Sequence, residues 1–310
     1  MRPQIDERWI AHFKSIGYPQ AQGLATGMEG AVYTLVPFKL VAKIWSNSNT
    51  EKARRQKRFY ECLAGAATDI QTPEIFEIHV IDSKVVTIEK FLGGVLLEEY
   101  LSRDAAHADA SGVDAILGVL RFLRSVPVGL FDSSIFDPDW SAAPAEPWGN
   151  FLQRMVSRRL GRYREQLQAD ITDLPRMEAA VGSFLATRNG AKLGLIHGDL
   201  CSSNVMADAE RRPVSVFDFS FLSSIGDPLF DASISSSIFN MYGAHAGKID
   251  KEVLDVFTKS LGYDRNVLVA YKAVYALLTS NIYSEPGTDG HYRWCVDILR
   301  RGDVRSSLGL

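Results

Sequence analysis

Cysteine is scarce in this chain. Its 310 residues include only three cysteines, which lie far apart and form no Cys-x-x-Cys pair: Cys62, Cys201 and Cys295. This spacing argues against a disulfide framework and against a zinc site, and it is typical of proteins kept in a reducing compartment. We therefore expect a cytoplasmic protein.

Long apolar runs and an excess of positive charge are also absent. Residues 1–17 alternate charged with apolar positions, unlike a signal peptide, and no later stretch reaches the roughly 18 apolar residues that a membrane span needs. The formal net charge is −3, which gives no electrostatic reason to expect nucleic acid or an anionic membrane as a partner. With this net charge, a cationic small molecule would be tolerated as a substrate.

The composition that is present is that of a globular protein, with 46% apolar and 23% charged residues, and the length suits two fused subdomains. Before residue 93, apolar and β-branched runs predict strands at 31–37, 39–45, 74–80 and 84–90. The capping box Ser48-Asn49-Thr50-Glu51 predicts one helix that ends at Ala64.

After residue 93 the spacing of apolar residues becomes helical. Helices are expected at 95–101, 113–124, 149–167, 177–187, 231–242, 252–261, 267–283 and 291–301. The longest irregular connection, 132–148, is expected at the mouth of a site. The sequence therefore predicts an α+β fold, in which residues 1–92 form a small antiparallel β lobe with one helix and residues 93–310 form a large, mainly helical lobe.

One polar motif carries most of the functional information. His197-Gly198-Asp199 is followed by Asn204, and then by Asp218 after an apolar run. An Asp five residues before an Asn, with a second Asp after a strand, is the polar skeleton of phosphoryl-transfer kinases. One carboxylate accepts the proton of the attacking hydroxyl, while an amide oxygen and the second carboxylate hold Mg²⁺. Those roles would fall on Asp199, Asn204 and Asp218.

These residues resemble the aminoglycoside phosphotransferase family, within the wider protein-kinase-like fold. His197 to Asn204 is similar to the family's His-Gly-Asp-x-x-x-x-Asn loop, and Asp218 followed by Gly226-Asp227-Pro228 and Asp231 is similar to its metal-binding segment. The resemblance implies a bilobal fold in which His197 organises the loop, Asp227 supports it and Asp231 caps the following helix.

The resemblance extends to nucleotide-binding residues in the first lobe. Val41-Ala42-Lys43 resembles the kinase strand whose lysine neutralises the α- and β-phosphates, and Gly27 and Gly30 would belong to the loop that covers the nucleotide. The Lys90 carbonyl and the Leu92 amide would bind the base. Gln56 stands on the inward face of the helix where the family usually has a Glu that pairs with the lysine.

The C-terminal helices resemble the family only in general pattern, with a faint similarity to hygromycin B phosphotransferase. The acceptor pocket is expected in the helical lobe, and its candidate residues are acidic or aromatic: Trp148, Tyr283, Glu285, Asp289 and Trp294. Core packing of the tryptophans and solvation of the acids are equally compatible with the sequence.

The expected function is transfer of the γ-phosphoryl group of ATP or GTP, with Mg²⁺, to a hydroxyl of a small molecule. The acceptor would be an aminoglycoside-like antibiotic, possibly cationic, and the protein a monomer or weak dimer. Two alternatives stay open at this point. One is a metabolite kinase of the choline, homoserine or fructosamine type, and the other is a nucleotide-binding pseudokinase, for which Gln56 is the only hint.

Overall fold

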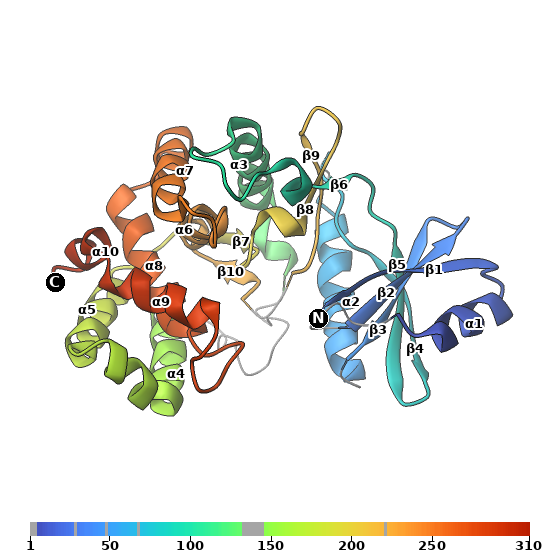
Figure 1. Cartoon of the computed structure of the whole chain (residues 1–310), viewed down its shortest axis with the longest axis horizontal. Helices are drawn as coiled ribbons and strands as arrows, with labels where there is room; N and C mark the ends of the chain where they lie inside the picture. Colours follow the sequence, from blue (N-terminus) through green and yellow to red (C-terminus); the bar gives the residue numbers. More distant parts are fainter. Residues whose placement is uncertain (1–4, 28–29, 47–48, 67–68, 132–145, 220–221) are drawn as a thin grey trace. The chain divides into compact units, whose positions relative to one another are not determined.

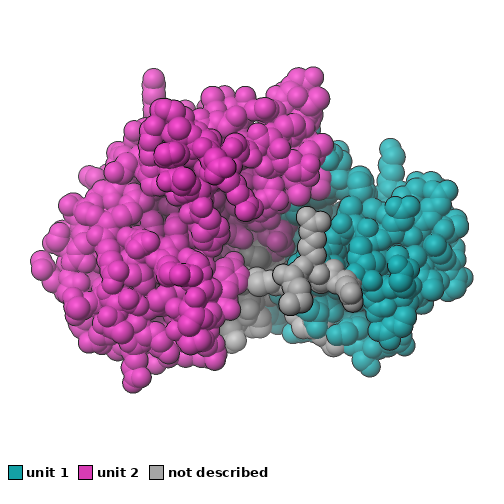
Figure 2. Space-filling view, in the orientation of Figure 1, with its two compact units in different colours: residues 1–94, 214–217 teal, residues 95–213, 218–310 magenta. Residues whose placement is uncertain are grey.

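A computed structural model of the chain describes residues 5–27, 30–46, 49–66, 69–131, 146–219 and 222–310. The chain divides into two compact units (Figure 2). Unit 1 comprises Met1–Gly94 with Val214–Phe217, and unit 2 comprises Val95–Pro213 with Asp218–Leu310. Unit 1 contains an antiparallel sheet and unit 2 is mainly helical, so the α+β prediction is confirmed. Residues 28–29 of the predicted nucleotide-covering loop and residues 132–145 of the predicted connection lie outside the described residues.

The sheet of unit 1 has five strands in the order β1-β2-β3-β5-β4, each antiparallel to its neighbour. The strands are β1 (Gln20–Gly27), β2 (Gly30–Val36), β3 (Leu40–Trp45), β4 (Ile75–Ile81) and β5 (Lys84–Lys90). The four predicted strands correspond to β2 to β5. The sequence analysis missed β1, whose Gln, Gly and Thr residues give no regular apolar alternation.

Two helices cover opposite faces of this sheet (Figure 1), where only one helix was predicted. The additional helix, α1 (Glu7–Ser15), inserts Phe13 into a core formed with Tyr33, Ala42 and Val86. On the other face, α2 (Thr50–Ala64) packs Ala53 against Trp45 and Val85. Because alternate residues of a strand point to opposite faces, Lys43 shares the α2 face with Trp45.

The start of α2 differs from the predicted capping box. Asn49 is the N-cap, and its side-chain oxygen accepts a hydrogen bond of 3.0 Å from the backbone amide of Lys52. The predicted cap, Ser48, lies outside the described residues. Both residue types cap helices well, so the sequence does not decide between adjacent candidates.

Unit 2 contains helices and short strands. The helices are α3 (Ala110–Ser125), α4 (Trp148–Asp170), α5 (Leu174–Ala186), α6 (Pro228–Ile238), α7 (Ala246–Leu261), α8 (Arg265–Thr279), α9 (Gly290–Arg300) and α10 (Gly302–Ser307). The strands are β6 (Val95–Leu96), β7 (Gly194–Ile196), β8 (Val205–Ala207) and β10 (Ser224–Gly226), and β9 (Pro213–Val216) runs from unit 2 into unit 1.

Helix α8 is the centre of unit 2, since it packs against α4, α6, α9 and α10 and is buried from Leu268 to Thr279.

The prediction of a helix at 95–101 is wrong. Val95 and Leu96 form β6, which pairs with β8, and only the short 3-10 helix Leu97–Tyr100 follows. Among the described residues, no helix combines the length and apolar character needed to cross a bilayer.

Candidate active site

The His197–Asn204 loop leaves the buried strand β7 and leads directly into β8, with a single 3-10 turn at Ser202–Asn204. Gly198 adopts φ +80°, a backbone conformation that glycine populates readily. A Cβ atom at this position would also lie 2.4 Å from the Cβ of Leu222. Both constraints explain why the motif has glycine before its aspartate.

The loop is fixed by a carboxylate from α6. Asp231 accepts hydrogen bonds from the backbone amides of His197 at 2.5 Å and Gly198 at 2.7 Å. Asp231 is buried, and this burial raises the pKa of its carboxyl group to about 7 despite the two amide bonds. Asp231 therefore holds the loop backbone directly.

Asp227 has the capping role instead. Its side chain accepts a hydrogen bond from the amide of Leu229 in the first turn of α6, and it also binds Arg188 at 2.7 Å and the Tyr271 hydroxyl at 2.8 Å. The roles that the resemblance implied for Asp227 and Asp231 are thus exchanged. The reason is geometric, because a carboxylate one turn into the helix is the one that reaches the loop amides.

His197 is completely buried and packs against Phe219, with ring centroids 4.6 Å apart. Its Nδ1 atom accepts a hydrogen bond of 3.3 Å from the amide of Asp199, and its carbonyl accepts one from Ser223. A histidine enclosed in this way can order the loop, and its contacts place it inside the protein rather than towards a substrate.

Asp199, Asn204 and Asp218 form the polar group of the site. The Asn204 side-chain nitrogen donates to the Asp199 carbonyl at 2.9 Å, which leaves the amide oxygen of Asn204 available as a ligand. Burial, followed by the charge of Asp218, raises the pKa of Asp199 to about 6. Two neighbouring carboxylates, together with an amide oxygen, are a donor set that suits Mg²⁺.

Asp218 adopts φ +63°, a left-handed conformation that is uncommon for residues other than glycine, although Asp and Asn tolerate it better than most. Asp218 is exposed, whereas Asn204 is buried. Residues held in such sparsely populated conformations concentrate at functional sites. Lys39, Asp82, Ser83 and Arg211 also have positive φ, so the backbone angle supports the motif without marking a site by itself.

A cavity of about 950 Å³ opens beside Asp199 within unit 2. Its walls near the loop are aromatic, and they include Tyr242, Tyr275, Tyr283 and His291. His291 meets Tyr283 edge-on at 5.1 Å and stacks on Trp294 at 5.7 Å. The cavity is also lined by Glu98, Glu99 and Asp109 from the segment before α3, and by the end of α6 with the residues that follow it.

Of the predicted acceptor residues, only Tyr283 lines this cavity in the described part of the chain. Trp148 is a core residue that donates to the Tyr271 hydroxyl and packs on Phe230. Glu285 pairs with Arg162, and Asp289 caps α9 through the amide of Tyr292. Trp294 packs behind the cavity wall, against His291 and Tyr275. Sequence reasoning missed Tyr242, Tyr275 and His291.

Burial lowers the pKa of His291 to about 4, so the cavity wall contains a neutral imidazole near pH 7. Between pH 6.5 and 4 the unfolded chain binds a proton that the native His291 does not, so stability should fall as the pH falls. The loss should approach about 2 kcal/mol between pH 7 and pH 5. We expect His291→Gln to show a correspondingly weaker pH dependence in urea unfolding of the two proteins. Equal pH dependence would contradict this assignment.

In unit 1, Lys43 lies on β3 opposite Thr87, with its Nζ atom 4.9 Å from the centre of the Trp45 ring. The Trp45 indole donates to Thr87 at 3.0 Å, and Thr87 in turn donates to Glu89. This polar chain lies on the α2 face of the sheet, as Lys43 does. The hydrogen bond to Thr87 holds the Trp45 ring beside the ammonium group of Lys43.

Gln56 is buried on α2, and its amide nitrogen donates to the Tyr60 hydroxyl at 2.8 Å. Gly27 and Gly30 pair at the end of the β1–β2 hairpin. A Cβ atom on Gly30 would lie 1.9 Å from the carbonyl oxygen of Ile44, so only glycine fits there. Lys90 ends β5, and Leu92 lies in the irregular segment that follows.

The model of the phosphotransferase enzyme family matches residues 21–252 of this chain. A search of curated proteins found no significant match. Comparison with solved structures found the GDP and kanamycin complex of APH(2")-IIia, with a TM-score of 0.61 and 14% identity over 94% of this chain and 98% of the other.

Two further structures are similar over most of their length. Plasmodium vivax ethanolamine kinase gives a TM-score of 0.64 at 15% identity and covers 96% of this chain and 87% of the other. Aminoglycoside phosphotransferase APH(3'')-Id from Streptomyces rimosus, in complex with ADP and streptomycin, gives 0.58 at 15% identity, with 96% and 100% covered. These matches confirm the protein-kinase-like fold, and they lend no support to a special likeness to hygromycin B phosphotransferase.

Proposed function

The chain belongs to the phosphotransferase enzyme family, and on this premise we propose that it transfers the γ-phosphoryl group of ATP or GTP to a hydroxyl of a sugar-containing antibiotic such as an aminoglycoside. The observation that carries the proposal is the position of Asp199 in the wall of a cavity of about 950 Å³. Phosphorylation of the acceptor would confer resistance. The three free cysteines suit a cytoplasmic enzyme, for which we propose a monomer or weak dimer.

Asp199 would orient the acceptor hydroxyl, or accept its proton, as the hydroxyl oxygen attacks the γ-phosphate. Asn204 and Asp218 would hold Mg²⁺, which when bound neutralises charge on the phosphate oxygens. His197 and Asp231 would keep the loop in place, because the first is enclosed by Phe219 and the second holds two backbone amides.

Residues of unit 1 would bind the nucleotide. Lys43 would neutralise the α- and β-phosphates, while the hairpin bounded by Gly27 and Gly30 would cover them. The Lys90 carbonyl and the Leu92 amide would bind the base. Gln56 can offer Lys43 a hydrogen bond but no charge, unlike the Glu that the family usually has at this position.

The cavity supports an acceptor of substantial size. Cavities of about 300–1,000 Å³ accommodate drug-sized ligands, and this one lies near the upper end of that range. Glu98 and Glu99 are exposed carboxylates in its wall, which favours a cationic acceptor, while the aromatic residues near Asp199 can pack against a sugar ring.

The second candidate function is that of a metabolite kinase, which is favoured by the similarity to an ethanolamine kinase. Ethanolamine has only four heavy atoms and would occupy a small part of the cavity, so the volume favours the first candidate.

The direct test of both candidates is to incubate the protein with Mg²⁺ and either ATP or GTP, together with pooled acceptors. Mass spectrometry then identifies which acceptor gains a phosphate. The pools are aminoglycosides, other glycosylated antibiotics, and choline, ethanolamine, homoserine and fructosamine. Phosphate on the metabolites alone would move the assignment to the second candidate, and phosphate on none of them would favour a pseudokinase.

Tyr283 provides a test of the acceptor cavity. An aromatic packing contact is worth about 0.5–1.5 kcal/mol, so Tyr283→Ala should raise the KM for the acceptor by about 3–10-fold. The KM for the nucleotide should stay unchanged, since the residue lies in the acceptor cavity. Phe38→Ala is a matched control, because Phe38 is 55% exposed and Tyr283 is 54% exposed. If both variants leave the acceptor KM unchanged, Tyr283 does not contact the acceptor.

A further inference from the structure

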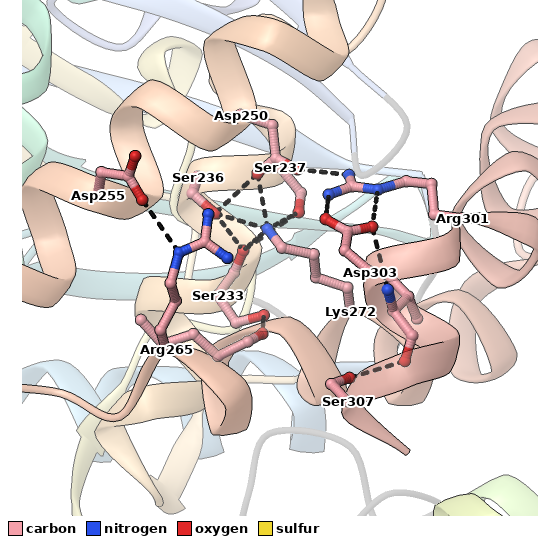
Figure 3. A network of polar contacts seen from close by, with 12 residues as sticks. Ser233, Ser236, Ser237, Asp250, Asp255, Arg265, Lys272, Arg301, Asp303 and Ser307 are labelled. Carbon is pink, nitrogen blue, oxygen red and sulfur yellow. Dashed lines mark hydrogen bonds and ion pairs between the residues drawn. The ribbon is translucent and has the colours of Figure 1, made fainter. Parts of the chain in front are cut away.

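A buried group of charges lies in the helical core of unit 2 (Figure 3). Lys272 of α8 is completely buried, and its Nζ atom lies 2.6 Å from Oδ1 of Asp250 on α7. Arg301 binds the second oxygen of Asp250 and both oxygens of Asp303. Two carboxylates and two cations therefore balance one another. Burial alone would raise the pKa of Asp250, but Lys272 and Arg301 more than offset this and keep the pKa below its usual value.

Within the described residues, the remaining hydrogen bonds of Lys272 go to α6. Its ammonium donates to the hydroxyl groups of Ser236 at 2.7 Å and Ser237 at 2.6 Å, and lies 3.3 Å from the carbonyl of Ser233. Ser236 also donates to Asp250 at 3.0 Å (Figure 3). Four of the five residues from 233 to 237 are buried serines, so polar contacts replace much of the apolar packing that usually fixes a core helix.

Helix α6 has a functional feature at each end of this serine segment. Asp231, two residues before Ser233, holds the amides of His197 and Gly198. Ile238, directly after Ser237, begins a run to Gly243 that lines the cavity beside Asp199. A rotation or shift of α6 would therefore move the anchor of the loop and the wall of the cavity together.

We propose that the network of Arg301, Asp250 and Lys272 is a positioning device, which holds α6 so that the Asp231 anchor and the acceptor wall keep one relative placement. Buried ion pairs often add little net stability compared with apolar residues of similar size, and their best-attested role is to fix register. The contacts of this network fit that role, because Lys272 and Asp250 both bond Ser236 of α6, the helix that carries both features, and Arg301 binds the second oxygen of Asp250. The functional part of this proposal rests on the proposed phosphotransfer reaction.

The test compares two arginines of the C-terminal segment. Arg301→Met breaks the network, whereas Arg305→Met breaks a pair with Asp173 that does not involve α6. The two arginine side chains are matched, at 20% and 25% exposure. The first readout is hydrogen exchange at the amides of His197 and Gly198, which needs no substrate. We expect about 10-fold faster exchange in Arg301→Met and unchanged exchange at these amides in Arg305→Met.

The second readout is the kinetics of transfer. We expect Arg301→Met to lower kcat about 10-fold with little change in the KM for the nucleotide, and Arg301→Lys to recover part of the loss through its single remaining bond to Asp250. If Arg301→Met does not fold, Ser237→Ala removes one contact of Lys272 without removing a charge and should shift both readouts in the same direction. Equal exchange at His197 and Gly198 in the 301 and 305 variants would overturn the proposal. Faster exchange in a protein that phosphorylates no acceptor would leave the positioning role intact and count against the proposed function.

Discussion

Replacement of Asp199 by alanine is expected to lower kcat about 10³-fold, while the dissociation constant of the nucleotide stays nearly unchanged. The carboxylate would act only on the attacking hydroxyl, whereas binding of the nucleotide would depend on Lys43 and the metal ligands. Single-turnover transfer and binding of a fluorescent nucleotide analogue measure the two quantities separately.

The structure adds a second expectation for this variant. The pKa of Asp199 is raised by burial and by Asp218, so its ionised form is destabilised in the native protein. Removing the carboxylate should therefore leave the thermal stability equal or higher, as is common for strained active-site groups. Asp208→Asn is a suitable control, because Asp208 pairs with Arg212 in a turn outside the cavity. Full turnover by Asp199→Ala, or a loss of activity matched by unfolding, would remove Asp199 from the chemistry.

Asp218→Asn is expected to weaken the apparent affinity for Mg²⁺ and the rate of transfer, each by about 10²-fold. A unit charge about 4 Å away contributes up to about 4 kcal/mol near a protein surface, and the exposure of Asp218 reduces this value. Asparagine tolerates the left-handed backbone of this position, so the substitution changes the charge and keeps the conformation. Titration of nucleotide binding with Mg²⁺ measures the effect.

The same substitution should also lower the pKa of Asp199, because the like charge of Asp218 is one of the two causes that raise it. Asp218→Gly serves as the partner variant, since it keeps the backbone and removes every ligand atom. If the Mg²⁺ titrations of wild type, Asp218→Asn and Asp218→Gly coincide, then Asp218 is not a metal ligand.

The parts of the protein that could be predicted are those specified by residues close together in the sequence. The loop from His197 to Asn204, followed by Asp218, is recognisable because its residues stand at fixed intervals between apolar runs. The strands β2 to β5 were equally visible from their β-branched and apolar residues. Helix α1 was not, because its nine residues contain only a few apolar positions, and only Phe13 is buried.

The parts that could not be predicted depend on residues far apart in the chain. Tyr242, Tyr275 and His291 reach one cavity from three separate segments, and no spacing rule connects them. Asp227 and Asp231 both stand at the start of α6, so only the position of the loop in space shows which of them holds it. Lys272 lies in an apolar helical run, where the sequence offers no sign of its distant partner Asp250.

The discontinuity of unit 1 limits how the protein can be dissected. Residues 214–217 belong to unit 1, although the chain on both sides of them belongs to unit 2. The Gln71 amide donates to the Val214 carbonyl at 2.8 Å, and the Val216 amide donates to the Gln71 carbonyl at 3.0 Å. A gene fragment that stops at Gly94 would encode Gln71 but neither Val214 nor Val216. No single cut in the polypeptide can therefore separate two complete halves, and complementation experiments would have to supply the short strand as an added peptide or by circular permutation.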